Sequence, residues 1–353
     1  MKDSGFSLLL LFGLSLFTAC VNTTSLVNDH ASYSQHPEPI VITDSSGAQI
    51  NIPHPATKIV SLNERATELL IAIGVSDRIV GVDDSSVKNP LFAGKLTQAS
   101  DVGNAFTPDV EAILALKPDV VIGYSTAKPH NLDKIIAANL TMTYIDSYRL
   151  SNLSGDALML GQITGNTGNA TMYSQFVNNN IDLVTSRLSS QNLIPPRVYF
   201  EAYSDYSVMT PRSAGGQILD QLGCRNVYGN TDMDWVTISP EWIVNQNPDI
   251  ILKIAANPKS SGESLEHVYD RIVNRTGYST MKAVQDKRVY VINADLASGP
   301  RADIGFLYIA KAVYPDLFSD VEPDAALHTY ANRFFSGADQ IETYYPPMTE
   351  ERT

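Results

Sequence analysis

The stretch from Lys58 to Val82, KIVSLNERATELLIAIGVSDRIVGV, constrains the fold more than any other part of the chain. Ile59, Val60 and Leu62 form a short apolar run with a β-branched bias, which predicts a buried strand. Asn63 is suited to cap a helix, apolar residues after it recur at helical spacing, and Gly74 stands where a helix commonly ends. Residues 79–82 predict the next strand. Strand, helix and strand within about 25 residues predict a parallel βαβ unit.

Polar residues directly after these two predicted strands are candidates for a binding site. Asn63, Glu64 and Arg65 follow the first strand, and Asp83 and Asp84 follow the second. In parallel α/β sheets, ligands bind outside the carboxyl ends of the strands. The alternative is that these side chains only cap helices, form turns or face water, which are common roles for these residue types.

The first 20 residues predict export. The apolar run from Phe6 to Phe17 is too short to span a membrane comfortably, and small residues precede Cys20. This pattern resembles the lipobox of bacterial lipoproteins, in which the cysteine is lipidated and becomes the new N-terminus. We therefore expect a signal peptide at 1–20, lipidation of Cys20 and a flexible tether at 21–38. Retention of an uncleaved N-terminal anchor is the alternative, and both place the remaining chain outside the cytoplasmic membrane.

Composition agrees with an exported α/β protein of two domains. The chain has 353 residues, of which 44% are hydrophobic and 18% charged, enough for two cores. The net charge of -13 argues against a nucleic-acid partner and against a basic membrane-binding patch. The second cysteine, Cys224, has no partner once Cys20 is lipidated, so no disulfide framework is expected.

The order of predicted elements divides the exported part into three segments. A β-hairpin followed by alternating strands and helices predicts an N-terminal lobe at 39–150. Residues 151–194 hold no strand-like run, and their apolar spacing predicts a short helix and then a helix of about 20 residues, ~30 Å long. The α/β pattern resumes after Pro195 and Pro196, which predicts a C-terminal lobe at 195–353. The long helix would connect the two lobes.

Two segments of the chain echo each other: VEAILALKPDVVI, from Val110, and PEWIVNQNPDIIL, from Pro240. In each, a glutamate (Glu111 or Glu241) lies seven residues before a Pro-Asp pair that leads into an apolar strand. The match predicts two lobes of similar fold around a cleft, with the glutamates in the first turns of equivalent short helices. Pro108 is expected at the first helical position of the first copy. The apolar side of that helix is expected to comprise Val110, Ile113 and Leu114.

The sequence resembles the class III substrate-binding proteins of ABC importers, a family that binds cobalamin, ferric siderophores and haem. The resemblance covers most of residues 57 to 316 and implies two α/β lobes with parallel-type sheets, a rigid connecting helix and a ligand cleft between the lobes. Where the family often has Ser-Pro after the first strand, this chain has Asn63 and Glu64, so its rim is more charged. The segments that carry the resemblance are KIVSLNERATELLIAIGVSDRIVGV, TPDVEAILALKPDVVIG, SAGGQILDQLGCRNVYG, ISPEWIVNQNPDIIL and KRVYVINADLASGPRADIGFLYIAKAVYP.

The resemblance implies a receptor without catalysis or a cofactor of its own. It would capture a small-molecule metal complex and deliver it, as a lipid-anchored monomer, to the transmembrane subunits of an ABC transporter. In this family, glutamates that match Glu111 and Glu241 meet arginines on the two transmembrane subunits. Compensation of the helix dipole is the other explanation for each glutamate taken alone.

Aromatic and arginine side chains at the predicted rims are the candidate ligand-binding residues. Aromatic rings offer apolar faces to a large chelate, and arginines offer forked donors to anionic oxygens. Four arginines in an acidic protein favour an anionic ligand, and so a ferric siderophore over cobalamin. Haem, and an oxyanion such as molybdate or tungstate, stay open as alternatives. The candidates are Arg65, Tyr124, Tyr148, Arg149, Tyr203, Tyr206, Arg212, Trp235 and Arg301.

Other functional classes find less support in the sequence. The chain has no phosphate-binding loop, Gly-x-Ser-x-Gly or HExxH motif. Its 6 histidines are scattered, and none pairs at metal-ligand spacing, so a bare divalent ion is a weak alternative. A hydrolase or chelatase built on the same lobes is a further alternative, and a structural surface protein is a third.

Overall fold

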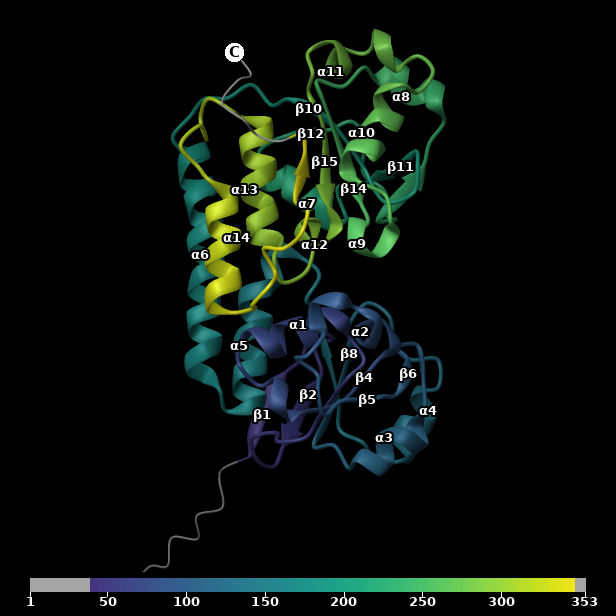
Figure 1. Ribbon diagram of the computed structural model, residues 1–353, viewed down its shortest axis with the longest axis vertical. Coiled ribbons are helices and arrows are strands. Elements are labelled where there is room, and N and C mark those ends of the chain that lie inside the picture. Colours follow the sequence, from purple (N-terminus) through teal and green to yellow (C-terminus); the bar gives the residue numbers. More distant parts are fainter. Residues whose placement is uncertain (1–38, 347–353) are drawn as a thin grey trace, which may run out of the picture. The chain divides into compact units, whose positions relative to one another are not determined.

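The computed structural model describes residues 39–346, which fall in one compact unit with a seven-stranded sheet, a five-stranded sheet and two two-stranded sheets (Figure 1). The N-terminal lobe holds an antiparallel hairpin and a five-stranded sheet of order β5-β4-β3-β8-β9, in which every pairing is parallel. The hairpin is β1 (Ile40–Thr43) and β2 (Gln49–Ile52). The sheet strands are β3 (Ile59–Ser61), β4 (Ile79–Val82), β5 (Ser100–Asp101), β8 (Val120–Tyr124) and β9 (Met142–Ile145). The helices are α1 (Glu64–Ala72), α2 (Asp84–Lys88), α3 (Val110–Leu116) and α4 (Leu132–Ala137).

The C-terminal lobe holds a mixed sheet of order β13-β11-β10-β14-β15-β16, with β12 also paired to β10. Its centre is parallel as expected, but β11, β13 and β16 add antiparallel strands that the sequence reasoning missed. The strands are β10 (Arg197–Glu201), β11 (Ser207–Met209), β12 (Arg225–Asn226), β13 (Trp235–Thr237), β14 (Ile250–Ala255), β15 (Val289–Asn293) and β16 (Tyr344–Tyr345). The helices are α7 (Ala214–Gln221), α8 (Pro240–Gln246), α9 (Pro258–Ser261), α10 (Leu265–Val273), α11 (Lys282–Gln285), α12 (Ala294–Ala297), α13 (Ala302–Val313) and α14 (Pro323–Arg333).

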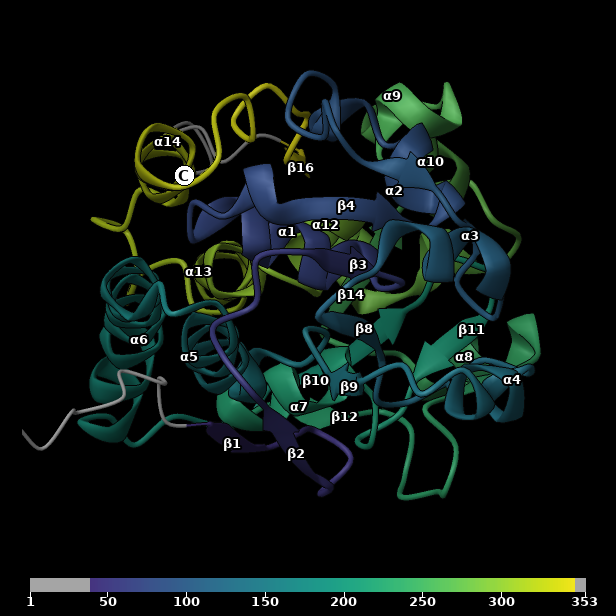
Figure 2. The same ribbon diagram turned by 90° about the horizontal axis from the view of Figure 1, so that it is seen from below.

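Two helices connect the sheets, as the apolar spacing predicted. They are α5 (Leu153–Thr164) and α6 (Thr167–Ser189), and the 23 residues of α6 span about 35 Å. Both views show α5, α6, α13 and α14 together on one side of the sheets (Figures 1 and 2). The C-terminal segment is not confined to its own lobe, because Phe335 packs on Phe92 with ring centroids 5.9 Å apart.

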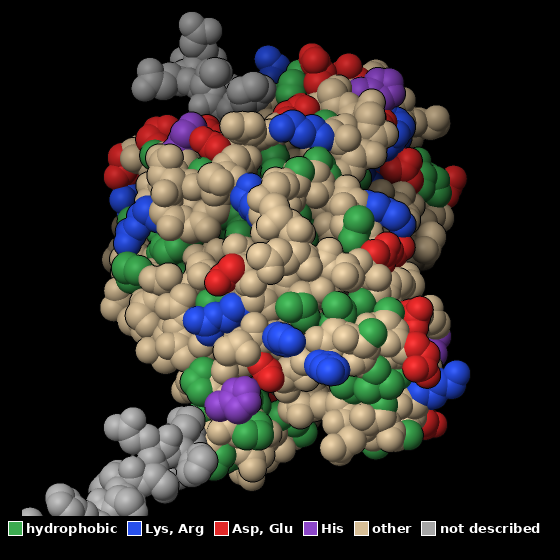
Figure 3. All heavy atoms as spheres, turned by 60° about the horizontal axis from the view of Figure 1, so that its bottom comes forward, with side chains coloured by type: hydrophobic (Ala, Val, Ile, Leu, Met, Phe, Trp, Pro, Cys, Tyr) green, Lys and Arg blue, Asp and Glu red, His purple; other side chains and the backbone are tan. Residues whose placement is uncertain are grey.

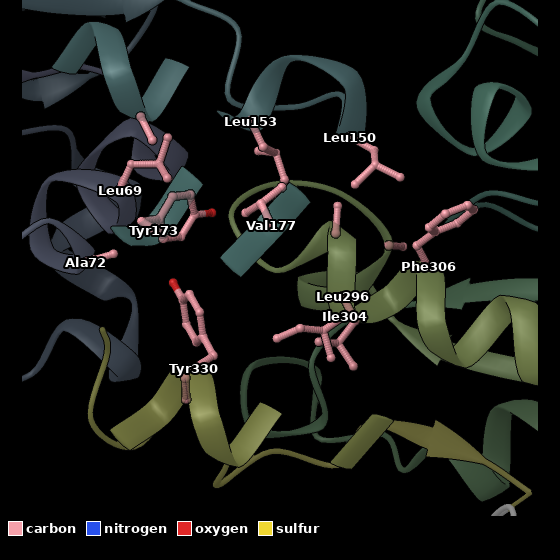
Figure 4. Close-up of a cluster of buried hydrophobic side chains, with 14 of the residues drawn as sticks. Leu69, Ala72, Leu150, Leu153, Tyr173, Val177, Leu296, Ile304, Phe306 and Tyr330 are labelled. Carbon is pink, nitrogen blue, oxygen red and sulfur yellow. The ribbon is translucent and has the colours of Figure 1, made fainter. Parts of the chain in front are cut away.

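One buried hydrophobic cluster extends between the lobes, and each lobe has a further cluster of its own. Figure 4 shows Leu69 of α1, Tyr173 of α6 and Tyr330 of α14 within this cluster, together with Leu296 and Ile304 from the C-terminal lobe. All five side chains are fully or almost fully buried. Packed interiors resist deformation, so a continuous core at this point restricts movement of one lobe against the other.

The turn after β3 forms as the sequence predicted. The Asn63 side chain accepts hydrogen bonds from the backbone N–H groups of Arg65 and Ala66 and so caps α1. Its amide also donates to the carbonyl of Ile145 at the end of β9. These hydrogen bonds fix the first turn of α1, which contains Arg65, relative to the end of β9.

The repeated segments form equivalent helices, α3 and α8, with two corrections to what the sequence predicted. Asp109 caps α3, so Pro108 lies before the helix, in the short strand β7 (Thr107–Pro108). In α8, by contrast, Ser239 is the cap and Pro240 takes the first helical position. The expected apolar stripe is also too wide. Ile113 is fully buried, but Leu114 is 37% exposed, because a helix of 7 residues turns few positions toward the sheet.

The surface of the described residues carries mixed charge. Figure 3 shows acidic and basic side chains intermixed on one face. Within 39–346, no helix has the length and apolarity to cross a membrane. Over the same range, no group of three or more His, Cys, Asp or Glu residues is placed to hold a metal ion. The predicted signal peptide, tether and Cys20 lie outside the described residues.

Candidate functional site

The main cavity lies between the two lobes, at the carboxyl ends of their strands, and has a volume of about 660 Å³. This is the edge where α/β sheets bind ligands. The N-terminal lobe contributes Arg65 after β3, Tyr124 at the end of β8, and Tyr148 and Arg149 after β9. Residues of the C-terminal lobe close the other side: Ala202, Tyr203, Ser204, Ser207, Met209, Asp234, Trp235, Ile254 and Ser298.

The structure brings six of the nine predicted ligand-binding residues into this cavity: Arg65, Tyr124, Tyr148, Arg149, Tyr203 and Trp235. The other three lie elsewhere. Tyr206 is covered by the Arg275 guanidinium, 4.5 Å from its ring centroid. Arg212 lines a neighbouring shallow pocket. Arg301 is 2% exposed and does not line this cavity, but it lines a small neighbouring pocket with Arg65 and Ser298.

Aromatic side chains form much of the cavity wall. Tyr203 and Trp235 are 55% and 56% exposed, which leaves apolar ring surface available to a ligand. Phe106 stacks on Tyr124 with ring centroids 6.1 Å apart and lines the same wall. Sequence reasoning missed Phe106, because it follows no predicted strand. The available signal was a bulky aromatic residue in the otherwise polar turn GNAFTPD.

Three of the four predicted arginines already have carboxylate partners, which weakens the sequence argument for a strongly anionic ligand. Each pair places a guanidinium nitrogen within hydrogen-bond distance of a carboxylate oxygen, so most of its charge is compensated. The pairs are Arg149 with Asp146 at 2.9 Å, Arg212 with Asp234 at 3.1 Å, and Arg301 with Glu68 at 2.8 Å.

Arg65 differs from the other three. Its Nη1 donates to the backbone carbonyl of Ser298, 3.3 Å away, and its guanidinium lies 5.3 Å from the ring centroid of Tyr148. Among residues 39–346, no carboxylate oxygen forms an ion pair with Arg65 within 4.0 Å. Arg65 therefore supplies a positive charge without a direct carboxylate partner, although the Glu64 carboxylate is close enough for the two charges to interact.

The cavity tyrosines stay protonated at neutral pH. Burial raises the pKa of Tyr124 to about 12, and burial also raises the pKa of Tyr148 and Tyr203. Although the Tyr203 side chain as a whole is half exposed, its hydroxyl end lies on the Arg65 side of the cavity, where the pKa responds to that guanidinium. The neutral phenols can donate hydrogen bonds to a ligand.

A buried charge cluster supports the loop that carries Tyr203. Lys253 and Glu201 are each 1% exposed, and Lys253 Nζ lies 2.7 Å from Glu201 Oε1. The same ammonium donates to the Tyr203 carbonyl at 3.0 Å. Arg275 donates twice to Glu201 and lies 2.7 Å from Asp205. The sequence signal for this cluster was a lysine within the apolar strand IILKIA.

Comparison with known proteins identifies the fold and the general role. A family model described as "Periplasmic binding protein" matches residues 59–296, more than half of the chain. This chain belongs to the periplasmic binding protein family. Members of this family are non-catalytic substrate-binding proteins.

Individual relatives agree with this assignment. The chain is 25% identical over 328 residues to the uncharacterized ABC transporter substrate-binding lipoprotein YvrC of Bacillus subtilis, covering 90% of this chain and 99% of that protein. It is 24% identical to a cobalamin-binding protein of Halobacterium salinarum, covering 70% and 67%. The TroA-like protein FepB of Veillonella parvula superposes with a TM-score of 0.71 at 24% identity, covering 87% and 99%, which supports the fold.

The chain is therefore an extracytoplasmic substrate-binding protein of an ABC importer, and a transmembrane permease is its partner. The structure places Glu111 and Glu241 on the surface, in the first turns of α3 and α8. Their contact with the permease stays a prediction.

Proposed function

We propose that this receptor captures a bulky, nearly neutral metal chelate of the corrinoid class and delivers it to the importer. The observation that carries the proposal is the combination of one arginine without a direct carboxylate partner, Arg65, with an aromatic wall around a cavity of about 660 Å³. Such a cavity suits a ligand with extended apolar faces and a single anionic group.

This proposal reverses the preference drawn from the sequence. A ferric siderophore was favoured because four arginines were taken as free positive charges. In the structure, Arg149, Arg212 and Arg301 are paired with carboxylates. A ferric tris-catecholate carries several negative charges and would meet one unpaired guanidinium here. Cobalamin, a corrinoid, carries one phosphodiester and a broad macrocycle with neutral amide side chains, so it is nearly neutral and fits better. Similarity to a cobalamin-binding relative points the same way.

The other ligand classes fit less well. A molybdate or tungstate ion would occupy a small part of the cavity and leave the aromatic wall without a contact. Haem would bring two carboxylates to a cavity in which only Arg65 lacks a direct carboxylate partner among the arginines that line it. Ferric siderophores stay as the second candidate class, because an exposed pair such as Arg212 with Asp234 could release its arginine to an anionic ligand.

The remaining roles complete the transport proposal. Arg65, Tyr124, Tyr148, Arg149, Tyr203 and Trp235 contact the ligand. Glu111 and Glu241 dock the two lobes on the two transmembrane subunits, since a symmetric pair of charges can fix register and orientation. Cys20 carries the lipid anchor, which keeps a monomeric receptor at the outer face of the cytoplasmic membrane.

Native mass spectrometry of the protein purified from its host membranes tests this proposal. We expect one intact metal chelate per chain and no conversion of that chelate on incubation. The Arg65→Ala variant, purified in parallel, should retain much less of it, because a charge-assisted contact contributes about 1.5–3 kcal/mol. Recovery of a bare ion, or chemical turnover of the bound compound, would count against a chelate receptor.

A further inference from the structure

Four consecutive residues between α12 and α13 each bond to a different residue of α1, α6 or the loop after β9. We call this segment, Ser298 to Arg301, the clasp. The Ser298 carbonyl accepts from Arg65 Nη1 at 3.3 Å, and the Gly299 N–H donates to the Tyr148 carbonyl at 3.3 Å. The Pro300 carbonyl accepts from the Tyr173 hydroxyl at 2.5 Å, and Arg301 Nε donates to Glu68 Oε1 at 2.8 Å.

The two ends of the clasp differ in exposure. Its far end is deep in the protein: Arg301 is 2% exposed, and Tyr173 and Tyr330 are fully buried in the shared core (Figure 4). The Tyr330 hydroxyl also donates to Glu68, the partner of Arg301. The near end, Ser298, lines the ligand cavity beside Arg65 and Tyr148. The buried end of the clasp, Arg301, is therefore only three residues from Ser298 in the cavity wall.

Gly299 is the position in the clasp that decides where Arg65 can lie. Its φ is +86°, a conformation that side-chain-bearing residues rarely adopt. A Cβ atom there would lie 2.6 Å from Arg65 Nη1 and 3.4 Å from its Cδ. Because Nη1 is the far end of a flexible side chain, a methyl group at 299 would displace the guanidinium more readily than the backbone.

We propose that the clasp is a positioning device for the ligand site and that Gly299 is its critical residue. Arg65, the arginine of the cavity without a direct carboxylate partner, is held by the Ser298 carbonyl on one side and occupies the space left by Gly299 on the other. The inference rests on the proposed function, in which Arg65 binds the anionic group of the chelate. A clasp that merely joined the lobes would not require Arg65 to lie against it.

Gly299→Ala is the test variant, and the chain offers a matched control. Gly337 has the same φ of +86°, but no atom lies within 4 Å of a Cβ built on it, so Gly337→Ala reproduces the backbone strain without displacing a side chain. Crystal structures of both variants without ligand give the first readout. We expect Arg65 to leave the Ser298 carbonyl in Gly299→Ala and to stay in Gly337→Ala. An unmoved Arg65 in Gly299→Ala overturns the inference.

Calorimetric titration with cyanocobalamin gives the second readout. Gly299→Ala should lose about tenfold or more in affinity, the effect of one charge-assisted hydrogen bond, and Gly337→Ala should bind as wild type. In an Arg65→Ala background, Gly299→Ala should cause no further loss, whereas a purely structural defect would add its own. An additive loss overturns the proposal.

A second, milder variant covers the case in which Gly299→Ala does not fold. Tyr173→Phe removes the hydroxyl that donates to Pro300 and little else. It should weaken cyanocobalamin binding in the wild-type background and not in Arg65→Ala, and equal losses in both overturn the inference. If wild-type protein does not bind cyanocobalamin at all, the ligand assignment fails, while the ligand-free crystal structures still decide whether the clasp positions Arg65.

Discussion

Asp119 and Asp249 make the same contacts in the two lobes. The Asp119 carboxylate accepts from the backbone N–H of Lys58 at 2.9 Å, and Asp249 accepts from that of Arg197 at 2.8 Å. In return, the N–H of each aspartate donates to the carbonyl of the same partner. Each aspartate thus fixes the start of one central strand against its neighbour, which makes the repeated segments structural equivalents.

This equivalence supports the first prediction, on docking. Glu111→Ala combined with Glu241→Ala should abolish uptake by cells while ligand affinity stays near the wild-type value, because both glutamates are exposed and outside the cavity. Each single change should reduce uptake less. Asp133→Ala with Asp220→Ala removes one exposed carboxylate per lobe outside the repeat and serves as the control. Normal uptake by the glutamate double variant, or lost ligand binding, would refute the docking role.

The second prediction concerns the buried charge cluster next to Tyr203: removing its carboxylate should destabilise the protein more than removing its lysine. Glu201→Gln leaves Lys253 and Arg275 buried together and should lower the free energy of unfolding by about 3–5 kcal/mol. Lys253→Met should cost less, because Glu201 keeps two bonds from Arg275 and one from the Tyr199 hydroxyl. Urea unfolding of both variants measures the difference. Equal losses, or a larger loss for Lys253→Met, would contradict this account of the cluster.

A third prediction concerns pH. Burial raises the pKa of Asp303 to about 6, from 3.8, and burial does the same for Asp156. The folded chain therefore holds these protons more tightly than the unfolded chain. The contribution of each raised pKa to the free energy of unfolding is fully present below the pKa of the unfolded chain. It is lost as pH rises through about 6, and amounts to on the order of 3 kcal/mol per carboxyl.

Urea unfolding at several pH values between about 4 and 7 tests this slope. Asp303→Asn cannot titrate, and its amide oxygen can still accept from Asn180. The variant should lose less stability across this range than wild type, although Asp156 keeps part of the slope. Parallel curves for the two proteins would show that Asp303 does not titrate in this range. Carboxyls with lowered pKa, such as Asp119 and Asp249, act at more acidic pH with the opposite sign.

The fourth prediction concerns anchoring. Cys20→Ala should release the protein from the membrane fraction or leave it as an unprocessed precursor, because the lipidated cysteine would be the anchor. Since a single acyl chain binds membranes only marginally, more than one chain is expected on Cys20. Fractionation and mass spectrometry of the N-terminus measure both. Normal processing with full membrane retention would point to a different anchor.

Local sequence patterns predicted the fold well where an element is determined by interactions among residues close together in the sequence. Asn63 caps α1 because its side chain meets the first N–H groups, a purely local interaction. The long helix α6 follows from apolar spacing alone. The antiparallel strands β11, β13 and β16 are only 2 or 3 residues long, and they form because a neighbouring edge is available, which no local pattern records.

The candidate site was less predictable, because it too depends on contacts between residues that are far apart in the sequence. Tyr124 ends a strand, and Tyr148 and Tyr203 follow strands. They were predicted because ligands bind at the carboxyl ends of parallel strands. Whether an arginine is free or paired depends on residues far away in the chain: Arg301 meets Glu68 across 233 positions. Sequence spacing does not reveal such a pairing, so the number of unpaired arginines was overestimated, and the charge of the ligand stays a prediction.

Titration of the purified chain with a panel of chelates tests the central claim most directly. Residues 39–353 would be titrated calorimetrically with cyanocobalamin, haemin and a ferric tris-catecholate, with Arg65→Ala as the paired variant. The account predicts 1:1 binding, tightest for cyanocobalamin and weakened about tenfold or more by Arg65→Ala. Tightest binding of the tris-catecholate, or no effect of Arg65→Ala on any member, would contradict the account.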